Sequence, residues 1–270
     1  MWKTRKLTDK SQILAYLETD RRYAAYAIGD LEPWMFEHTS WAGAERAGRL
    51  QALTLHFRGL KLPALFLMGH NEGLRAIIER ELRPERVYFT CHQRHLLLIC
   101  EFYHWEERIP MWRMVLQPAR FRPAQSGCVR LSHAHLDELT QLYALGGGDA
   151  FTLLQLEHGV FYGVQMADQL VAVAGTHLVS PTYGVAAVGN VFTHPDYRGR
   201  GFGTATTSAV VDELLQSGIR DIVLNVSQDN AIAVRLYEQL GFERYCPFLE
   251  GPAFASRTPN RQPIPGTAGQ

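Results

Sequence analysis

Residues 188–205, VGNVFTHPDYRGRGFGTA, run from an apolar segment into a loop that holds two arginines and three glycines. The following residues, GTATTSAVVDELLQSG, have the pattern of a helix that ends at Gly218. A strand, a glycine-rich turn and a helix in this order bring backbone N–H groups and the positive helix end together. Glycine can adopt positive φ and lets an anion approach the main chain closely. The stretch therefore predicts an anion-binding loop, although a plain connector can have the same pattern.

Two common nucleotide-binding loops do not fit this stretch. The Gly-Lys-Ser or Gly-Lys-Thr ending of a P-loop is missing. The order Arg-x-x-Gly-x-Gly also differs from the Gly-x-Gly-x-x-Gly of a dinucleotide site. Arg198 and Arg200 are suited to charge-assisted contacts with phosphate, so an anion of another kind is the remaining expectation.

A second motif follows the helix. The apolar strand DIVLNVS leads into NAIAVRLYEQLGF, which begins at Asn230 and ends at Phe242. Asn230 has the residue type and position of a helix N-cap. Ala233 and Tyr237 are four residues apart and share one helix face. A tyrosine on an amphipathic helix is most often a core residue, so the motif alone does not assign its role.

Taken together, the two motifs resemble the GNAT superfamily of acyl-CoA-dependent N-acyltransferases. The first matches the superfamily's pyrophosphate motif at Arg198, Gly201 and Gly203, and the second matches its Asn-x-x-Ala-x-x-x-Tyr-x-x-x-Gly-Phe pattern. The resemblance covers about residues 128–248. It implies an α/β fold with a mixed β-sheet flanked by helices, in which two central strands, residues 183–193 and 221–227, splay apart.

The resemblance also implies acetyl-CoA or another acyl-CoA as co-substrate, with no metal. Main-chain amides around Val191 and Thr193 would pair with the pantetheine arm, and those near the start of the helix would hold the pyrophosphate. Tyr237 would act as the general acid that protonates the departing CoA thiolate, a transfer that a phenol held at hydrogen-bond distance can make. The implied acyl-CoA-binding residues are Val191, Phe192, Thr193, Arg198, Gly199, Arg200, Gly201, Phe202, Gly203, Thr204, Asn230 and Ala233.

The general base is where this chain departs from the superfamily. An alkylamine with a pKa of ~10 is protonated at neutral pH and must lose a proton before it attacks a thioester. Many members of the superfamily carry a glutamate two residues ahead of the position of Val191, and this chain has Gly189 there. The base then comes from elsewhere, the acceptor amine is already neutral, or the protein binds acyl-CoA without catalysis.

His177, on the neighbouring predicted strand, is the candidate base that we select, because imidazole has a suitable ordinary pKa. Glu157, His158 and Asp149 are weaker candidates, and His194 is interpreted as part of a His-Pro-Asp turn. Gly189 itself has two further interpretations. It makes room for a bulky acceptor or acyl group, or it marks a strand bulge.

The chain divides into two tandem domains by its composition. A stretch with two prolines and two arginines, LQPARFRPAQSG at 116–127, is interpreted as a linker. We expect a degenerate acyltransferase-like domain over 1–120 that helps to form the acceptor pocket. The acyl-CoA-binding catalytic domain would cover 121–250, and a Pro-, Gly- and Ser-rich disordered tail would cover 251–270.

Composition excludes several classes of partner. The 27 basic and 27 acidic residues cancel, so the chain has no global field for nucleic acid or an anionic membrane. No apolar stretch reaches the ~20 residues that span a bilayer. The four cysteines lack zinc-type spacing, which favours a reduced cytoplasm. The sequence leaves the oligomeric state open, a homodimer included.

The sequence therefore predicts an N-acyltransferase that acts on a small-molecule amine or an amino acid. Two alternatives are a non-catalytic acyl-CoA-binding regulatory module and an N-acetyltransferase of a protein or peptide.

Overall fold

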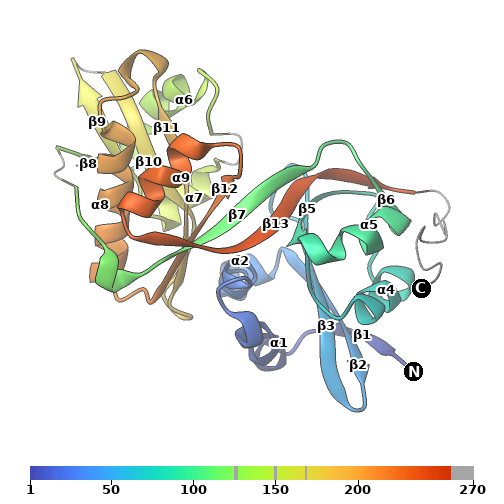
Figure 1. Ribbon diagram of the computed structural model, residues 1–270. Helices are drawn as coiled ribbons and strands as arrows, with labels where there is room; N and C mark the ends of the chain where they lie inside the picture. Colours follow the sequence, from blue (N-terminus) through green and yellow to red (C-terminus); the bar gives the residue numbers. More distant parts are fainter. Residues whose placement is uncertain (125–126, 149–150, 168, 257–270) are drawn as a thin grey trace, which may run out of the picture. The chain divides into compact units, whose positions relative to one another are not determined.

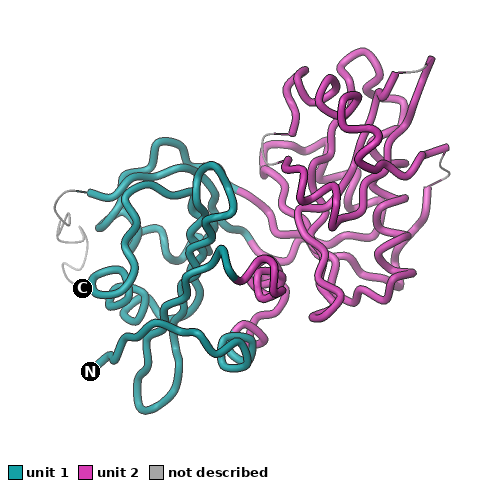
Figure 2. The backbone as a smooth tube through the Cα atoms, turned by 180° about the vertical axis from the view of Figure 1, so that it is seen from behind, with its two compact units in different colours: residues 1–16, 37–110, 247–270 teal, residues 17–36, 111–246 magenta. Residues whose placement is uncertain are grey.

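The computed structural model describes residues 1–270 except 125–126, 149–150, 168 and 257–270. The chain forms two compact units, which Figure 2 shows in different colours. Unit 1 contains residues 1–16, 37–110 and 247–270, and unit 2 contains residues 17–36 and 111–246.

Unit 1 is built on a mixed sheet in the order β1-β2-β3-β4-β5-β13, with β6 also paired to β13. The apolar faces of α4 and α5 pack with the inner residues of this sheet into one core. Its elements are β1 (Lys3–Leu7), α1 (Lys10–Leu17), β2 (Thr39–Arg46), β3 (Arg49–Phe57), β4 (Ala64–Gly69), α4 (Asn71–Arg80), β5 (Arg86–His92), α5 (Leu96–Phe102), β6 (Tyr103–Trp105) and the later part of β13 (Phe242–Ala255).

In unit 2 the strands pair in the order β13-β7-β12-β11-β10-β9-β8 (Figure 1). The strands are β7 (Ile109–Leu116), β8 (Val129–Arg130), β9 (Tyr162–Met166), β10 (Gln169–Ser180), β11 (Val185–Thr193) and β12 (Asp221–Ser227). The helices are α2 (Ala25–Gly29), α3 (Pro33–Phe36), α6 (Leu136–Tyr143), α7 (Leu153–His158), α8 (Phe202–Gln216) and α9 (Ala231–Gln239). The predicted strands and helices of this part of the chain are confirmed.

The two central strands of unit 2 are paired over only the first half of their length. β11 and β12 run parallel and pair from Val185 opposite Asp221 to Val188 opposite Leu224. Both strands then continue, but they are no longer paired with each other. The predicted splayed sheet flanked by helices is confirmed, and the gap opens beside Gly189.

The two faces of this sheet are covered differently. Even-numbered residues such as Val188 of β11 and Leu224 of β12 pack with Val210 and Val234 of α8 and α9 in one core. Side chains alternate along a strand, so Gly189 and Asn225 belong to the opposite face. α2 contacts β10 and β11 from that second face.

Residues 17–36 belong to unit 2. This division of the chain differs from a single domain boundary near residue 120, which would place these residues in the N-terminal domain. Glu32 accepts hydrogen bonds from Ser180 Oγ (2.6 Å) and from Thr182 N and Oγ1 (3.2 and 3.0 Å). Arg21 pairs with Asp221 (2.6 Å) and also donates to the Tyr183 carbonyl. These contacts join segments far apart in sequence, which is why local composition does not reveal them.

A second difference lies near the end of the described chain. Residues 251–255, predicted as the start of a disordered tail, continue β13, where Gly251 to Phe254 pair with β5. The rest of that predicted tail, 257–270, lies outside the described residues.

Candidate functional site

The loop before α8 has the backbone that a glycine-rich anion site requires. Gly199 and Gly201 have φ values of +75° and +79°, and Gly201 is the N-cap of α8. A Cβ on either glycine would have no atom within 4 Å. These glycines are therefore needed for their left-handed backbone, and the space outside the loop is open.

Hydrogen-bond donors surround this open space. The amides of Phe202, Gly203 and Thr204 belong to the first turn of α8, where no intrahelical acceptor exists. Arg198 Nε donates to the Thr193 carbonyl (3.2 Å), and Arg200 donates to the Asp196 carbonyl (3.4 Å). These bonds hold both guanidinium groups beside the loop. The predicted cradle thus combines free amides, a helix N-terminus and two cations.

The structure brings three predicted segments together at Gly203. A Cβ added there would lie 3.4 Å from Thr193 Oγ1 and 3.5 Å from Leu236 Cδ1. Thr193 ends β11, and Leu236 lies on α9 next to Tyr237. The end of a splayed strand, the start of α8 and one face of α9 therefore meet at one point.

The free edge of β11 faces the gap. His194 N–H donates to Val171 O (2.9 Å) on the β10 side. Successive N–H groups alternate in direction along a strand, so the amides of Thr193 and Val191 point to the β12 side. β12 does not pair with this part of β11. These two amides can pair with an extended ligand chain.

α9 begins as the sequence predicts. Asn230 is its N-cap, and Asn230 Oδ1 accepts a hydrogen bond from Ala233 N (3.1 Å). Tyr237 is 7% exposed and packs edge-on against Phe242. Burial raises the pKa of Tyr237 to about 12, so the phenol stays protonated at neutral pH. Its hydroxyl forms no hydrogen bond with the described residues and is available as a donor.

The His177 ring occupies the space beside Gly189, where many superfamily members carry a glutamate side chain. Gly175 of β10 lies opposite Gly189, and the register shifts between Thr176 and Leu178. A Cβ on Gly189 would overlap the His177 ring. The expectation that Gly189 makes room for a bulky ligand is therefore corrected, because a side chain of the next strand occupies that room.

His177 belongs to a row of side chains on the α2 face. Its ring centroid is 6.1 Å from that of Tyr26 on α2. The buried Arg113 places its guanidinium over the Tyr26 ring at 4.6 Å, and Arg113 is opposite Asn225 of β12 in the strand register. The row crosses the sheet where β11 and β12 separate. Burial lowers the pKa of His177 to about 4, so its imidazole is neutral at pH 7.

Asn190 distorts β11 next to Gly189. Its φ is +52°, which is uncommon for any residue other than glycine. The Tyr143 hydroxyl donates to its carbonyl (2.7 Å), and its side-chain amide donates to Gln155 Oε1 (3.1 Å). The expected strand irregularity is present here. A Gly-Asn pair inside an apolar strand is the sequence signal that could have identified it.

The weaker candidate bases have other surroundings. His158 stacks on Trp34 with ring centroids 4.7 Å apart. His194 Nδ1 accepts a hydrogen bond from Asp196 N (3.2 Å), as expected for a turn residue. Glu157 lies beside His158 near the end of α7 and is exposed. Asp149 lies outside the described residues.

Two residues of α2, Tyr26 and Asp30, were missed by sequence reasoning. Tyr26 contacts His177, and Asp30 is 7% exposed one turn further along the chain. Their spacing of four indicates a shared helix face, but nothing in the sequence connects that face with β10.

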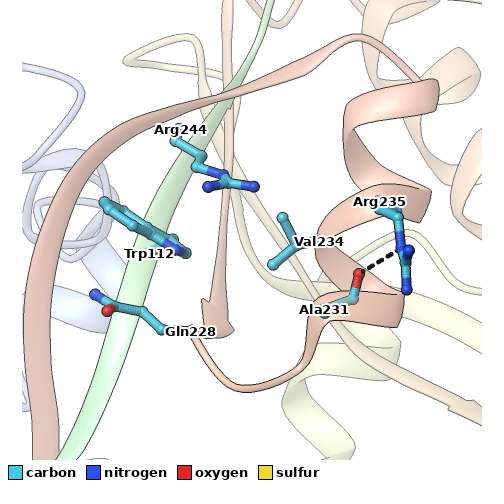
Figure 3. A pocket seen from close by; sticks show the side chains of 6 residues that line it. All are labelled: Trp112, Gln228, Ala231, Val234, Arg235 and Arg244. Atoms are coloured by element: carbon cyan, nitrogen blue, oxygen red, sulfur yellow. Dashed lines mark hydrogen bonds between the residues drawn. The ribbon is translucent and has the colours of Figure 1, made fainter.

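A cavity of about 270 Å³ lies beside the N-terminal half of α9 (Figure 3). Arg244 lies over the Trp112 ring at 5.6 Å and pairs with Glu238 (2.9 Å). The lining of this cavity contains no predicted site residue. The lining residues are Trp112, Gln228, Ala231, Val234, Arg235 and Arg244.

The described residues lack two further features. No group of three or more His, Cys, Asp or Glu side chains is arranged to hold a metal ion. No helix in the described ranges has the length and apolar character needed to cross a membrane.

Known proteins share the motifs of unit 2. The model of the acetyltransferase (GNAT) family matches residues 128–242. A mycothiol acetyltransferase of Renibacterium salmoninarum is 36% identical over 90 residues, which make up 32% of this chain and 27% of that protein. The ribosomal protein bS18-alanine N-acetyltransferase of Escherichia coli K12 is 40% identical over 57 residues, 21% of this chain and 38% of that protein. The chain thus matches well under half the length of these curated relatives.

The fold of the chain also has a solved counterpart. A tandem GNAT protein from the clavulanic acid biosynthesis pathway covers 96% of this chain and 100% of its own length, with a TM-score of 0.59 and 16% identity. At this identity the likeness concerns the fold alone. It shows that the chain has the fold of two GNAT domains in tandem.

Proposed function

We propose, from the match of residues 128–242 to the acetyltransferase (GNAT) family, that the protein transfers an acetyl group from acetyl-CoA to a small-molecule amine. The observation that carries this proposal is the meeting of Thr193, Gly203 and Leu236 at one point. There a free strand edge, a helix N-terminus and α9, through Leu236 next to Tyr237, adjoin a single open loop.

Each part of the donor has a counterpart in this arrangement. The amides of residues 200–204 and the positive end of α8 bind the pyrophosphate, with Arg198 and Arg200 beside them. The amides of Val191 and Thr193 pair with the pantetheine arm. The thioester then enters the gap between β11 and β12 beside Gly189.

The reaction is a direct transfer. The neutral amine attacks the thioester carbonyl, the carbon–nitrogen bond forms, and the carbon–sulfur bond breaks. Tyr237 protonates the leaving thiolate. His177, which is neutral at pH 7, is the candidate base at the position of the superfamily glutamate, where its ring nitrogen can accept a hydrogen bond from the attacking amine.

The acceptor is a small amine or an amino acid. One relative is named for mycothiol and another for the alanine of a ribosomal protein, so their names span small and protein acceptors. Residues 17–36 cover the α2 face of the sheet, where the acceptor must reach the gap. This cover favours a small acceptor. The four cysteines are not joined in disulfides, which supports a reduced cytoplasmic location.

The test is CoA release by the purified protein, followed with a thiol reagent, over a panel of amines and amino acids. We expect saturable release with at least one acceptor and binding of acetyl-CoA in the micromolar range typical of enzyme substrates. Tight acetyl-CoA binding without turnover on any acceptor would contradict the enzyme and favour the acyl-CoA-binding regulatory module.

A further inference from the structure

Asp30 is a buried carboxylate to which the fold gives no hydrogen bond. It is 7% exposed, and no described residue donates to its oxygens, which are not completely enclosed. Glu32 is equally buried at 6% exposed, yet it accepts three hydrogen bonds from Ser180 and Thr182. Two residues apart, one carboxylate anchors the segment and the other is left without a partner.

The position of Asp30 follows from the helix it ends. Asp30 N–H donates to the Tyr26 carbonyl (3.0 Å), so the two side chains lie on the same helix face one turn apart. Tyr26 faces His177. Gly29 packs so closely on Leu178 that a Cβ would overlap that side chain. The end of α2 therefore lies against β10 at the residues that adjoin Gly189.

An unpaired carboxylate in this position is costly to the fold. Taking a charged group out of water without a hydrogen bond is strongly unfavourable. Burial accordingly raises the pKa of Asp30 to about 8. A group kept at such a cost, beside a predicted reaction centre, is more often functional than structural.

We propose that Asp30 binds the ammonium group of the acceptor and takes its first proton. This inference rests on the proposed acetyltransferase function and names the base of that reaction. It assigns His177 the role of accepting a hydrogen bond from the amine, rather than that of final proton acceptor.

The proton balance supports this division. An alkylammonium acceptor loses two protons during transfer. The first goes to the Asp30 carboxylate before the amine attacks, and Asp30 then releases it to solvent. The second leaves the nitrogen for solvent once the carbon–nitrogen bond has formed, and solvent returns to Tyr237 the proton that it gives to the CoA thiolate. A base of pKa about 8 is ~2 pH units below an amine of pKa ~10, whereas a base of pKa about 4 is ~6 units below it. Asp30 is therefore the more effective acceptor.

The charged and titratable groups on this side of the sheet set the local field. They are Tyr26 of α2, His177 of β10 and Arg113 of β7, with His158 of α7 stacked on Trp34. Because Asp30 must be ionised to act as a base, kcat/KM should rise with pH through its pKa and level off above it.

The experiment compares Asp30→Asn with Glu32→Gln, the matched change at the hydrogen-bonded carboxylate, and with His177→Gln. For each, kcat/KM is measured from pH 6 to pH 10, together with acetyl-CoA affinity and thermal unfolding. We expect Asp30→Asn to lower kcat/KM by about 100-fold or more. The decrease in kcat/KM below about pH 8, called the acidic limb of the pH profile, should disappear in this variant. Its acetyl-CoA affinity and folding should be retained.

Glu32→Gln should lower thermal stability and leave the acidic limb in place. His177→Gln should also leave the acidic limb in place. If Asp30→Asn keeps both the rate and the limb, or if the limb moves with His177 instead, the inference is overturned while the proposed function stands. If the wild-type protein turns over no acceptor, the proposed function and this inference are both overturned.

Discussion

At the scale of single residues, the exchange between Gly189 and His177 explains how the site departs from its superfamily. Removing the side chain at 189 leaves a space on the strand, and the imidazole of the next strand fills it. The two positions therefore depend on each other, because the His177 ring fits only when residue 189 has no side chain.

The pair predicts a non-additive response to mutation. Gly189→Ala forces a methyl group into the His177 ring and should lower the free energy of unfolding by about 1–3 kcal/mol. His177→Ala removes the obstacle, so the double variant Gly189→Ala/His177→Ala should be more stable than the sum of the single effects allows. Chemical denaturation of the four proteins measures this. Additive changes would mean that the two side chains do not compete for one space.

Tyr237 should act in the chemical step alone. Tyr237→Phe keeps the ring that packs against Phe242 and removes the hydroxyl donor. We expect kcat to fall by about 100-fold or more, with acetyl-CoA affinity unchanged. Steady-state kinetics and calorimetric titration check the two quantities. An unchanged kcat would exclude the hydroxyl as the donor to the thiolate.

At the scale of elements, α8 has two glycines with similar geometry and different surroundings. Gly201 at its start and Gly218 after its end have φ values of +79° and +80°, and neither has an atom within 4 Å of its Cβ position. Gly201 adjoins the free amides of the first turn, whereas Gly218 follows the negative end of the helix.

This symmetry provides a controlled test of the anion site. Gly201→Glu and Gly218→Glu should cost similar backbone strain, on the order of 1 kcal/mol each. Only Gly201→Glu brings a negative charge to the proposed pyrophosphate site, so it alone should weaken acetyl-CoA binding by at least tenfold. Calorimetric titration of both variants measures this. Equal affinities would remove the loop from the donor site.

At the scale of the whole molecule, the two units repeat one arrangement of elements. In unit 1, β4 and β5 are parallel, joined by α4 and paired from Ala64 opposite Tyr88 to Leu67 opposite Cys91. β11, α8 and β12 have the same order in unit 2. The turn before α4 is closed, because a Cβ on Gly69 would overlap Tyr16 and the Gln51 carbonyl. Its glycine serves close packing, which supports acyl-CoA binding by unit 2 alone.

The buried groups also predict how global stability depends on pH. Asp30 has a pKa of about 8 in the folded protein, above its ordinary value near 4, so its ionisation reduces stability as pH rises toward 8. His177, with a pKa of about 4, acts in the opposite direction between about pH 4 and 6.5. His95 and His56, whose pKa values burial also lowers, act in the same direction as His177, and the effect of all three declines above pH 6.5.

We therefore expect the free energy of unfolding to fall by about 1–2 kcal/mol more between pH 6.5 and pH 8 in the wild-type protein than in Asp30→Asn. Urea denaturation at the two pH values measures the difference, with Glu32→Gln as the control that retains it. The same decrease in Asp30→Asn and in the wild-type protein would contradict the burial of an ionisable Asp30.

The sequence by itself determined the fold of residues 128–248 and predicted the residues of the proposed donor site. This was achievable because a glycine loop, an N-cap and a helix face are encoded by residues within a few positions of one another, as Gly201, Asn230 and Tyr237 illustrate. Only the tertiary structure decided the acceptor side. Residues 17–36 join unit 2 through Glu32 and Arg21, the His177 ring fills the space at Gly189, and α2 brings Asp30 to β10. The contacts of Glu32, Arg21 and α2 join segments more than 100 positions apart, and His177 reaches Gly189 through the register of two paired strands. A local pattern carries no signal for either kind of relation.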